Sequence, residues 1–221
     1  MRLGIHVALA LAMILGFVRP GLAADAAALK AEMSGDKALG SASAPVTLIE
    51  YASLSCSHCA AFHHQVLPVI QKEYIDTGKV RYIFRDFPLN GAALFASLVT
   101  HCSAQQGGDE KYFAVLKDIM EQQSMWRQSG SSRASLLLIA TGQGMDGKKL
   151  TACIDDYKAL EERIITSRKD AVDQLGIKKT PAFLVNGELI ESMRTPAEAR
   201  QAIDAALAKA AQPSTVSQPT G

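Results

Sequence analysis

A pair of cysteines stands where a predicted strand meets a predicted helix. Residues 46–51 (VTLIEY) are β-branched and apolar enough for a buried strand, and after the CSHC motif at 56–59 apolar side chains recur at helical spacing. We expect Pro68 to kink this helix midway and Gly78 to end it. Residues 80–87 (VRYIFRDF) predict a second strand. The result is a strand–helix–strand unit that carries the cysteine pair at the start of its crossover helix, which favours an α/β fold.

The spacing of the two cysteines has a chemical rationale. Three residues of separation within a first helical turn bring both sulfurs to bonding distance, and the free N–H groups and positive dipole end of the helix favour a thiolate there. We therefore expect Cys56 to be the exposed nucleophile and Cys59 to be the more buried resolving thiol. His58 lies between them, where its imidazole could donate to the Cys56 sulfur and lower the pKa of that thiol.

Two other uses of this pair are open. The motif could be half of a zinc site, with His58, His63 and His64 as further candidate ligands, or it could be a purely structural disulfide. Zinc usually takes a second closely spaced pair, whereas Cys102 and Cys153 are far apart. Redox catalysis is therefore the favoured interpretation, and His63 and His64 are expected to be surface histidines of the helix.

The rest of the chain changes from helical to strand patterns. Residues 90–175 have helical periodicity, residues 181–185 (PAFLV) return to strand character, and Asn186-Gly187 indicates a tight hairpin. This order predicts a three-layer α/β fold interrupted by an inserted all-helical domain. The expected divisions are a signal peptide (1–23), a lead-in too short for a domain (24–44), an α/β domain (45–89 plus 176–211), the inserted helical domain (90–175) and a disordered tail (212–221).

The N-terminus has the layout of an export signal. Arg2 precedes an apolar run over residues 3–18, and small residues follow, so we expect cleavage after Ala23 or Ala24. The alternative is an uncleaved membrane anchor, but about 16 apolar residues fall short of the roughly 20 that span a bilayer. Cleavage would change the formal net charge from +1 to −1, and a near-neutral charge argues against a nucleic-acid partner. Export places the four cysteines in an oxidising compartment.

These motifs together resemble the DsbA-like thiol:disulfide oxidoreductases. The resemblance rests on the strand–CSHC–helix unit, the Thr180-Pro181 step before a strand, the hairpin and the helical insertion, and it covers roughly residues 44–211. It implies a thioredoxin fold with an inserted helical domain, a cis peptide bond at Pro181 opposite the cysteine pair, and an extended Thr180 that presents main-chain groups to a peptide. It also implies that Glu50, six residues before Cys56, is a buried acid that assists proton transfer. No bound cofactor is expected.

Three positions matter for the direction of electron flow. Ser57 stands where the best-known strong oxidants carry proline, which indicates a milder potential. His63 stands where some relatives carry a second acid, and Thr180 occurs in isomerase-type as well as oxidase-type relatives.

The resemblance favours an exported, periplasmic dithiol oxidase that acts on reduced secreted proteins through a shallow apolar surface. It also implies a DsbB-like membrane quinone reductase as the reoxidant. Isomerases of this kind usually carry a separate dimerisation domain, for which the roughly 20 residues before the first strand leave no room, so we expect a monomer. The alternatives are an isomerase or reductase of the same fold, or a peptide-binding holdase whose cysteine pair is incidental.

The other two cysteines lie on apolar faces of the predicted inserted helices. The preferred interpretation, as in some relatives of this family, is a structural disulfide between Cys102 and Cys153, and the alternative is two independent buried thiols. Closing a loop of about 50 residues would contribute up to about 4 kcal/mol by chain entropy.

Overall fold

The computed structural model describes residues 26–190 and 192–212. The expected signal peptide at 1–23 lies outside the described residues, as does all but the first residue of the expected tail at 212–221. Within the described part, no helix combines the length and the apolar character needed to cross a bilayer.

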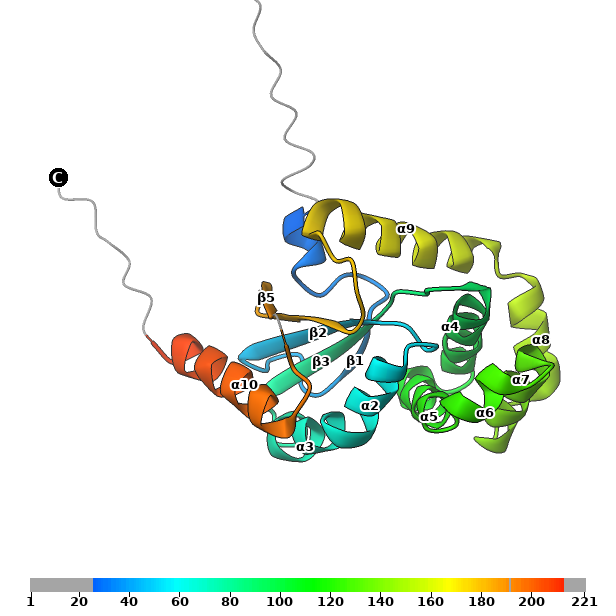
Figure 1. Ribbon diagram of the computed structural model, residues 1–221, viewed down its shortest axis with the longest axis horizontal. Coiled ribbons are helices and arrows are strands. Elements are labelled where there is room, and N and C mark those ends of the chain that lie inside the picture. Colours follow the sequence, from blue (N-terminus) through cyan, green and yellow to red (C-terminus); the bar gives the residue numbers. More distant parts are fainter. Residues whose placement is uncertain (1–25, 191, 213–221) are drawn as a thin grey trace, which may run out of the picture.

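A five-stranded mixed sheet forms the centre of the molecule (Figure 1). β2 and β3 run parallel, as a crossover helix between them requires, and every other neighbouring pair is antiparallel. The central strands are almost continuously buried because both faces of the sheet are covered. In spatial order the strands are β1 (Lys37–Leu39), β3 (Val80–Asp86), β2 (Val46–Ala52), β4 (Ala182–Val185) and β5 (Glu188–Ile190).

β1 lies inside residues 24–44, which the sequence predicted to be a lead-in too short for a domain. It pairs antiparallel with β3 and extends the sheet, so the α/β domain begins before residue 45. Its three residues are too few to display a strand period, and its pairing with β3 is what makes it a strand. The segment before it is held by Arg85, which donates to the carbonyls of Leu29 and Ala31 and forms a buried ion pair with Asp36 at 2.7 Å.

The crossover between β2 and β3 is broken into three pieces. These are α2 (Ser57–Gln65), α3 (Leu67–Ile70) and a π-helical turn, η1 (Gln71–Ile75). The break falls at Val66, where φ is −109°, whereas the expected kink was at Pro68. Pro68 instead occupies the first turn of α3, where its missing N–H costs nothing. Gly78 follows η1 in a left-handed conformation with φ of 73°, which only glycine adopts freely.

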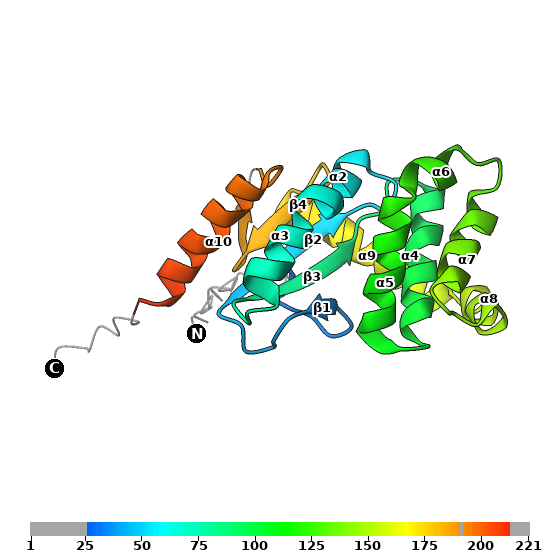
Figure 2. The ribbon, with the colours of Figure 1, turned by 90° about the horizontal axis from the view of Figure 1, so that it is seen from below.

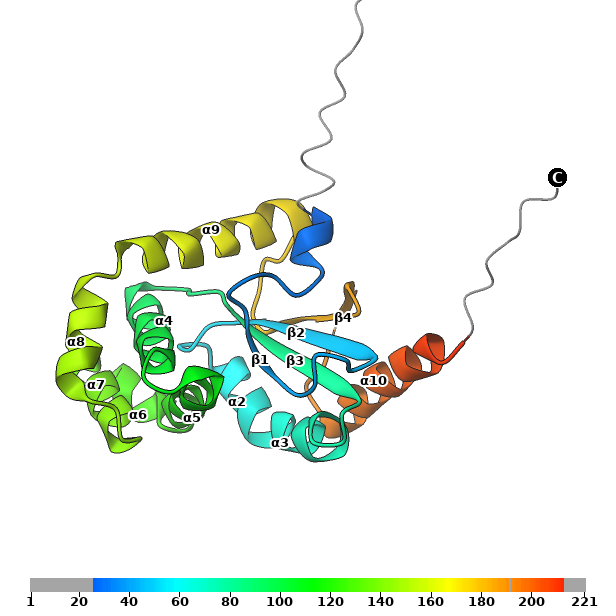
Figure 3. The ribbon, with the colours of Figure 1, turned by 180° about the vertical axis from the view of Figure 1, so that it is seen from behind.

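Helices cover both faces of the sheet, giving three layers (Figures 1 and 3). α9 (Lys158–Leu175) lies over one face, where it packs on a small apolar cluster that includes Ile49, Tyr51 and Ile83. α2, α3 and α10 (Pro196–Ala210) lie over the other face, which belongs to the larger core. The remaining helices gather beside the sheet (Figure 2). The helices after β3 are α4 (Gly91–Ala104), α5 (Gly108–Glu121), α6 (Gln123–Gln128), α7 (Ser132–Gly142), α8 (Gly147–Asp155), α9 and α10.

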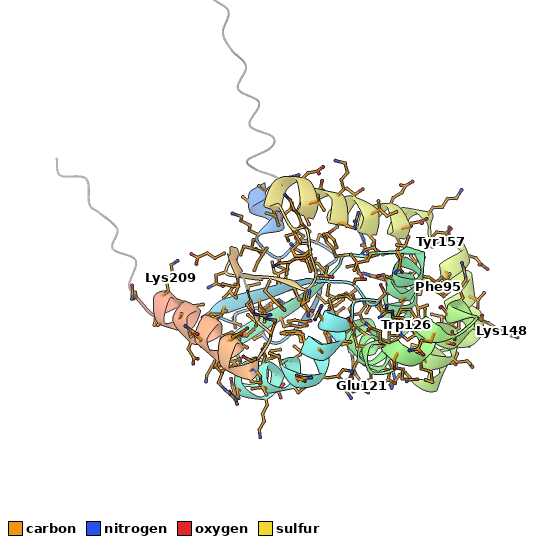
Figure 4. The ribbon with its side chains drawn as sticks, viewed as in Figure 1. Phe95, Glu121, Trp126, Lys148, Tyr157 and Lys209 are labelled. Atoms are coloured by element: carbon orange, nitrogen blue, oxygen red, sulfur yellow. A yellow bond between two sulfur atoms is a disulfide. The ribbon has the colours of Figure 1, made fainter. Side chains whose placement is uncertain are left out.

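Most of the buried apolar side chains of the helices between β3 and β4 belong to the same large cluster as the core on the α2 side of the sheet. Trp126 of α6 is fully buried there, with its indole N–H donating to the Ile119 carbonyl at 2.8 Å (Figure 4). The expected disulfide between Cys102 and Cys153 is confirmed; it joins α4 to α8 with 5.8 Å between the Cα atoms. The insertion therefore shares its apolar core with the sheet and has a covalent crosslink of its own.

Candidate active site

Cys56 occupies the N-cap of α2. Its backbone is extended, with φ of −84° and ψ of 120°, and its sulfur accepts a hydrogen bond from the Cys59 N–H at 3.4 Å. No acidic residue lies in the first turn of α2 to oppose a negative charge. The helix start therefore offers the Cys56 sulfur both free N–H groups and the positive end of the helix dipole.

The Cys56 sulfur is more covered than a freely exposed nucleophile would be. Cys56 is 8% exposed and Cys59 is 0% exposed, so the order of exposure is as expected but Cys56 is itself nearly buried. The cause is contact from two distant segments: the Thr180 carbonyl lies 3.4 Å from the Cys56 sulfur, and the Gln123 amide donates to the Cys56 carbonyl at 3.0 Å. Gln123 also donates to the Leu54 carbonyl at 2.8 Å.

The two thiols differ strongly in acidity. Hydrogen bonding from the Cys59 thiol is the largest influence that lowers the pKa of Cys56 to about 5. The Thr180 side chain and the N–H groups of Cys59 and His58 lower it further, against the opposing effect of burial. Burial raises the pKa of Cys59, as do its hydrogen bond to Cys56 and the nearby Glu50 charge. At neutral pH, Cys56 is therefore a thiolate and Cys59 a thiol.

His58 contributes to this site in a different way from that expected. Its side chain is exposed, and among the described residues its imidazole makes no hydrogen bond to the Cys56 sulfur. Its backbone N–H, which lies in the first turn of α2, supports the Cys56 thiolate instead. This placement follows from the helix start, because the main-chain N–H groups there point at the cap while the early side chains face solvent.

The Thr180–Pro181 peptide bond is cis, as the resemblance implied. It precedes β4 and faces the start of α2, since the Thr180 carbonyl oxygen lies 3.4 Å from the Cys56 sulfur. The cis proline step and the cysteine pair therefore form one surface, although Cys56 and Thr180 are separated by 124 positions in the chain.

Glu50 lies in the core on the α2 side of the sheet. Because strand side chains alternate, its neighbours Ile49 and Tyr51 face α9 while Glu50 faces the cysteines. Glu50 is fully buried, and its Oε2 accepts from the Tyr82 hydroxyl at 2.5 Å and lies 3.1 Å from His63 Nε2. Its Oε1 has no hydrogen-bond partner among the described residues.

The expectation of two surface histidines is wrong for His63. The His63 side chain is 5% exposed and lies edge-on to the rings of Phe62 and Phe84, each 5.8 Å away. His64 is exposed, as expected. One signal could have found the buried position: His63 is four residues after Cys59, so the two share a face of α2.

A cavity of about 400 Å³ opens beside the cysteine pair. Its apolar floor includes Phe62, Phe183 and Met193, and Pro181 also lines it. The expectation of an apolar surface is incomplete, because three basic side chains stand at the cavity: His58, Lys179 and Arg194. Within the described residues, no three potential metal ligands of the His, Cys, Asp or Glu types converge.

Fold and site together define a thioredoxin-fold protein with a dithiol centre. The thioredoxin family model matches residues 32–205 of the chain. Among solved structures, alpha-DsbA1 of Wolbachia pipientis is 33% identical, with a TM-score of 0.74, and the match covers 81% of this chain and 94% of that one. The chain belongs to the DsbA-like thiol:disulfide oxidoreductases, the branch of this fold with an inserted helical domain.

Other relatives agree with this assignment. A protein-disulfide oxidoreductase of Rickettsia bellii is 31% identical over 71% of this chain, and the chain spans only 59% of that relative's length. BdbD of Bacillus subtilis is 22% identical with a TM-score of 0.71, covering 80% of this chain and 95% of that one, which supports the fold.

Proposed function

We propose that this chain is an exported dithiol oxidase that introduces disulfides into reduced secreted proteins. The observation that carries the proposal is the asymmetry of the pair, with the pKa of Cys56 lowered to about 5 and that of Cys59 raised. Relative to an ordinary thiol, such a thiolate stabilises the reduced enzyme at pH 7 by about 3 kcal/mol, or about 60 mV of two-electron potential. A stabilised reduced form makes the disulfide form a stronger oxidant.

The reaction follows from the positions of the two sulfurs. A substrate thiolate attacks Cys56, the less buried sulfur of the Cys56–Cys59 disulfide, so a mixed disulfide forms and Cys59 leaves and takes up a proton. A second substrate thiolate then attacks the substrate sulfur of the mixed disulfide and releases Cys56 as a thiolate. Two electrons pass to the enzyme. The low pKa of Cys56 favours its departure.

The cavity beside Cys56 is the proposed site for the substrate peptide. Apolar side chains of an unfolded chain can pack on Phe62, Phe183 and Met193, while the main-chain groups at Thr180 can pair with the backbone of that chain. A shallow surface of this kind suits many substrates.

Export and reoxidation belong to the same proposal. The signal-like pattern over residues 1–23 supports a periplasmic location, where disulfides persist. A DsbB-like membrane quinone reductase is the proposed reoxidant, and we propose that the protein works as a monomer.

The equilibrium reduction potential of the Cys56–Cys59 pair in a glutathione buffer tests the direction of electron flow. We expect a value nearer to about −120 mV than to about −180 mV. A value near about −180 mV would indicate an isomerase, and one near about −270 mV would indicate a reductase.

Cys56→Ser tests whether the pair is catalytic at all. We expect it to abolish oxidative refolding of a reduced substrate, while Ser57→Ala, at the exposed neighbouring position, retains it. If Cys56→Ser leaves a protective effect on unfolded chains unchanged and wild type shows no oxidation, the chain is a peptide-binding module.

A further inference from the structure

The chemistry at Cys59 requires a proton to reach a fully buried sulfur. Each time the disulfide is reduced, Cys59 leaves as a thiolate and is protonated, and each time it re-forms, the Cys59 thiol loses that proton. Cys59 is 0% exposed, so bulk water does not touch its sulfur. The Glu50 carboxylate, whose charge acts on Cys59, is 0% exposed as well. A third group is needed to connect them to solvent.

The Glu50 carboxylate is held at one oxygen only. Oε2 is bound by the Tyr82 hydroxyl and by His63, whereas the buried Oε1 has no partner among the described residues. Tyr82 is itself fully buried, so its hydroxyl cannot pass a proton onward to water. His63 differs, because its side chain retains 5% exposure while its Nε2 lies 3.1 Å from Oε2.

We propose that His63 is the proton carrier that links Glu50, and through it Cys59, to solvent. The proposal rests on thiol–disulfide exchange at Cys56 and Cys59. On reduction, His63 Nε2 passes a proton to the Glu50 carboxylate, the resulting carboxylic acid gives it to the departing Cys59 sulfur, and the imidazole takes a proton from water at its other nitrogen. On oxidation, the same proton moves out by the reverse path. Glu50 and His63 therefore neither gain nor lose a proton over a full cycle of reduction and oxidation.

No other titratable side chain on α2, α3 or α5 is placed to carry a proton to Glu50 in the part of the chain that the structure describes. α3, which follows α2, has no titratable side chain. On α2 itself, His58 and His64 are exposed. α5 packs against α2, but its charged side chains are engaged elsewhere or exposed: Asp109 binds Lys37, Lys117 binds Glu121, Asp118 binds Gln143, Lys111 binds the Gln143 carbonyl, and Glu110 is exposed.

The test compares His63→Gln with His64→Gln, the same change at the exposed neighbour. The glutamine side chain in His63→Gln would keep a hydrogen-bond donor near Glu50 but cannot relay a proton. Two half-reactions are measured by acid quench, alkylation and mass spectrometry: reduction of the oxidised protein by dithiothreitol, and oxidation of the reduced protein by oxidised glutathione. His63→Asn serves as a second variant if His63→Gln does not fold, and urea unfolding checks both.

Loss of a proton carrier changes the rates of both half-reactions but leaves the equilibrium constant against glutathione unchanged. We expect His63→Gln to slow both half-reactions by about tenfold or more, with its equilibrium constant against glutathione within about threefold of wild type. His64→Gln should stay within about twofold in all three quantities. The proposal is overturned if the two variants behave alike, or if the change in one rate equals the change in the equilibrium constant, which is the signature of a purely structural or electrostatic role.

Failure of this proposal is separate from failure of the proposed function. Both half-reactions use small thiols and disulfides, so they report on His63 whether the chain oxidises, isomerises or reduces proteins. The reduction potential and the refolding assay with Cys56→Ser decide the function without reference to His63.

Discussion

At the scale of single residues, the site depends on two sulfurs in opposite environments. Cys56 receives hydrogen bonds at a helix start, whereas Cys59, three residues later, is fully buried. The sequence predicted this order because the first turn of a helix has a defined direction. It did not predict how closely Thr180 and Gln123 cover Cys56, because these contacts come from segments far along the chain.

The pKa of Cys56 makes the stability of the reduced protein depend on pH. This pKa is about 5 in the folded protein and about 8.5 for an ordinary thiol, so the thiolate stabilises the fold. That stabilisation is fully present above about pH 8.5 and is lost as the pH falls through about 5. We expect the urea unfolding free energies of reduced wild type and Cys56→Ala to separate by about 4 kcal/mol from pH 5 to pH 8.5. A constant difference over that range would contradict the assignment.

His63 illustrates what residue patterns leave open. Its spacing from Cys59 is compatible with the buried face of α2, but the same histidine would be stable on the surface. Only the position of Glu50 on β2, and of the Phe84 ring on β3, decides that the imidazole points inward. Helical periodicity cannot reveal this contact, because Glu50 lies 13 residues earlier in the chain and on a strand.

At the scale of elements, α6 supports the loop at residues 53–56, which joins β2 to α2 and ends at Cys56. Gln123→Ala removes two hydrogen bonds and leaves the carbonyls of Leu54 and Cys56 without that donor. We expect a loss of about 2 kcal/mol in urea unfolding and slower exchange at Cys56. Gln128→Ala, at the exposed end of the same helix, should change neither quantity appreciably. Equal behaviour of the two variants would show that Gln123 does not anchor the loop.

The disulfide between α4 and α8 also stabilises the molecule at the scale of elements. Replacing Cys102 and Cys153 together by alanine opens a crosslink across 51 residues and should lower the unfolding free energy by up to about 4 kcal/mol. The half-reactions of the active-site pair should persist, because neither cysteine touches it. Mass spectrometry of the unreduced digest should find the two cysteines joined, and two alkylatable thiols at these positions would refute the crosslink.

Sequence patterns predicted long elements better than short ones. The strands β2 and β3 agree with the expectations, as does the hairpin at Asn186-Gly187, where both residues have positive φ, because the local chemistry is strong. β1 was missed because Lys37–Leu39 has no period of its own and forms through pairing with β3. The break at Val66 was misplaced by two residues, because proline at the first turn of a new helix resembles a kink within one long helix.

At the scale of the whole molecule, one buried ion pair joins the N-terminal segment to the sheet. The Arg85 side chain is 2% exposed and binds Asp36 with two nitrogens. Arg85→Met would remove the guanidinium from the buried Asp36 carboxylate and from the carbonyls of Leu29 and Ala31, and we expect a loss of about 3–5 kcal/mol in thermal unfolding. Arg81→Met, which removes the more exposed pair with Glu32, should cost about 1 kcal/mol or less. Similar losses for both variants would contradict a special role for Arg85.

The hold of Arg85 on the N-terminal segment also fixes the side from which the molecule can be tethered. The helical turn at residues 26–29 lies beside the end of α9, and the Leu29 carbonyl accepts from Tyr51 on that face of the sheet, opposite α2 (Figure 1). A linker, a bead or a fused domain attached ahead of residue 26 would therefore approach the molecule from the α9 face of the sheet, away from the cysteine pair. The cavity beside Cys56 would stay uncovered by the attached group.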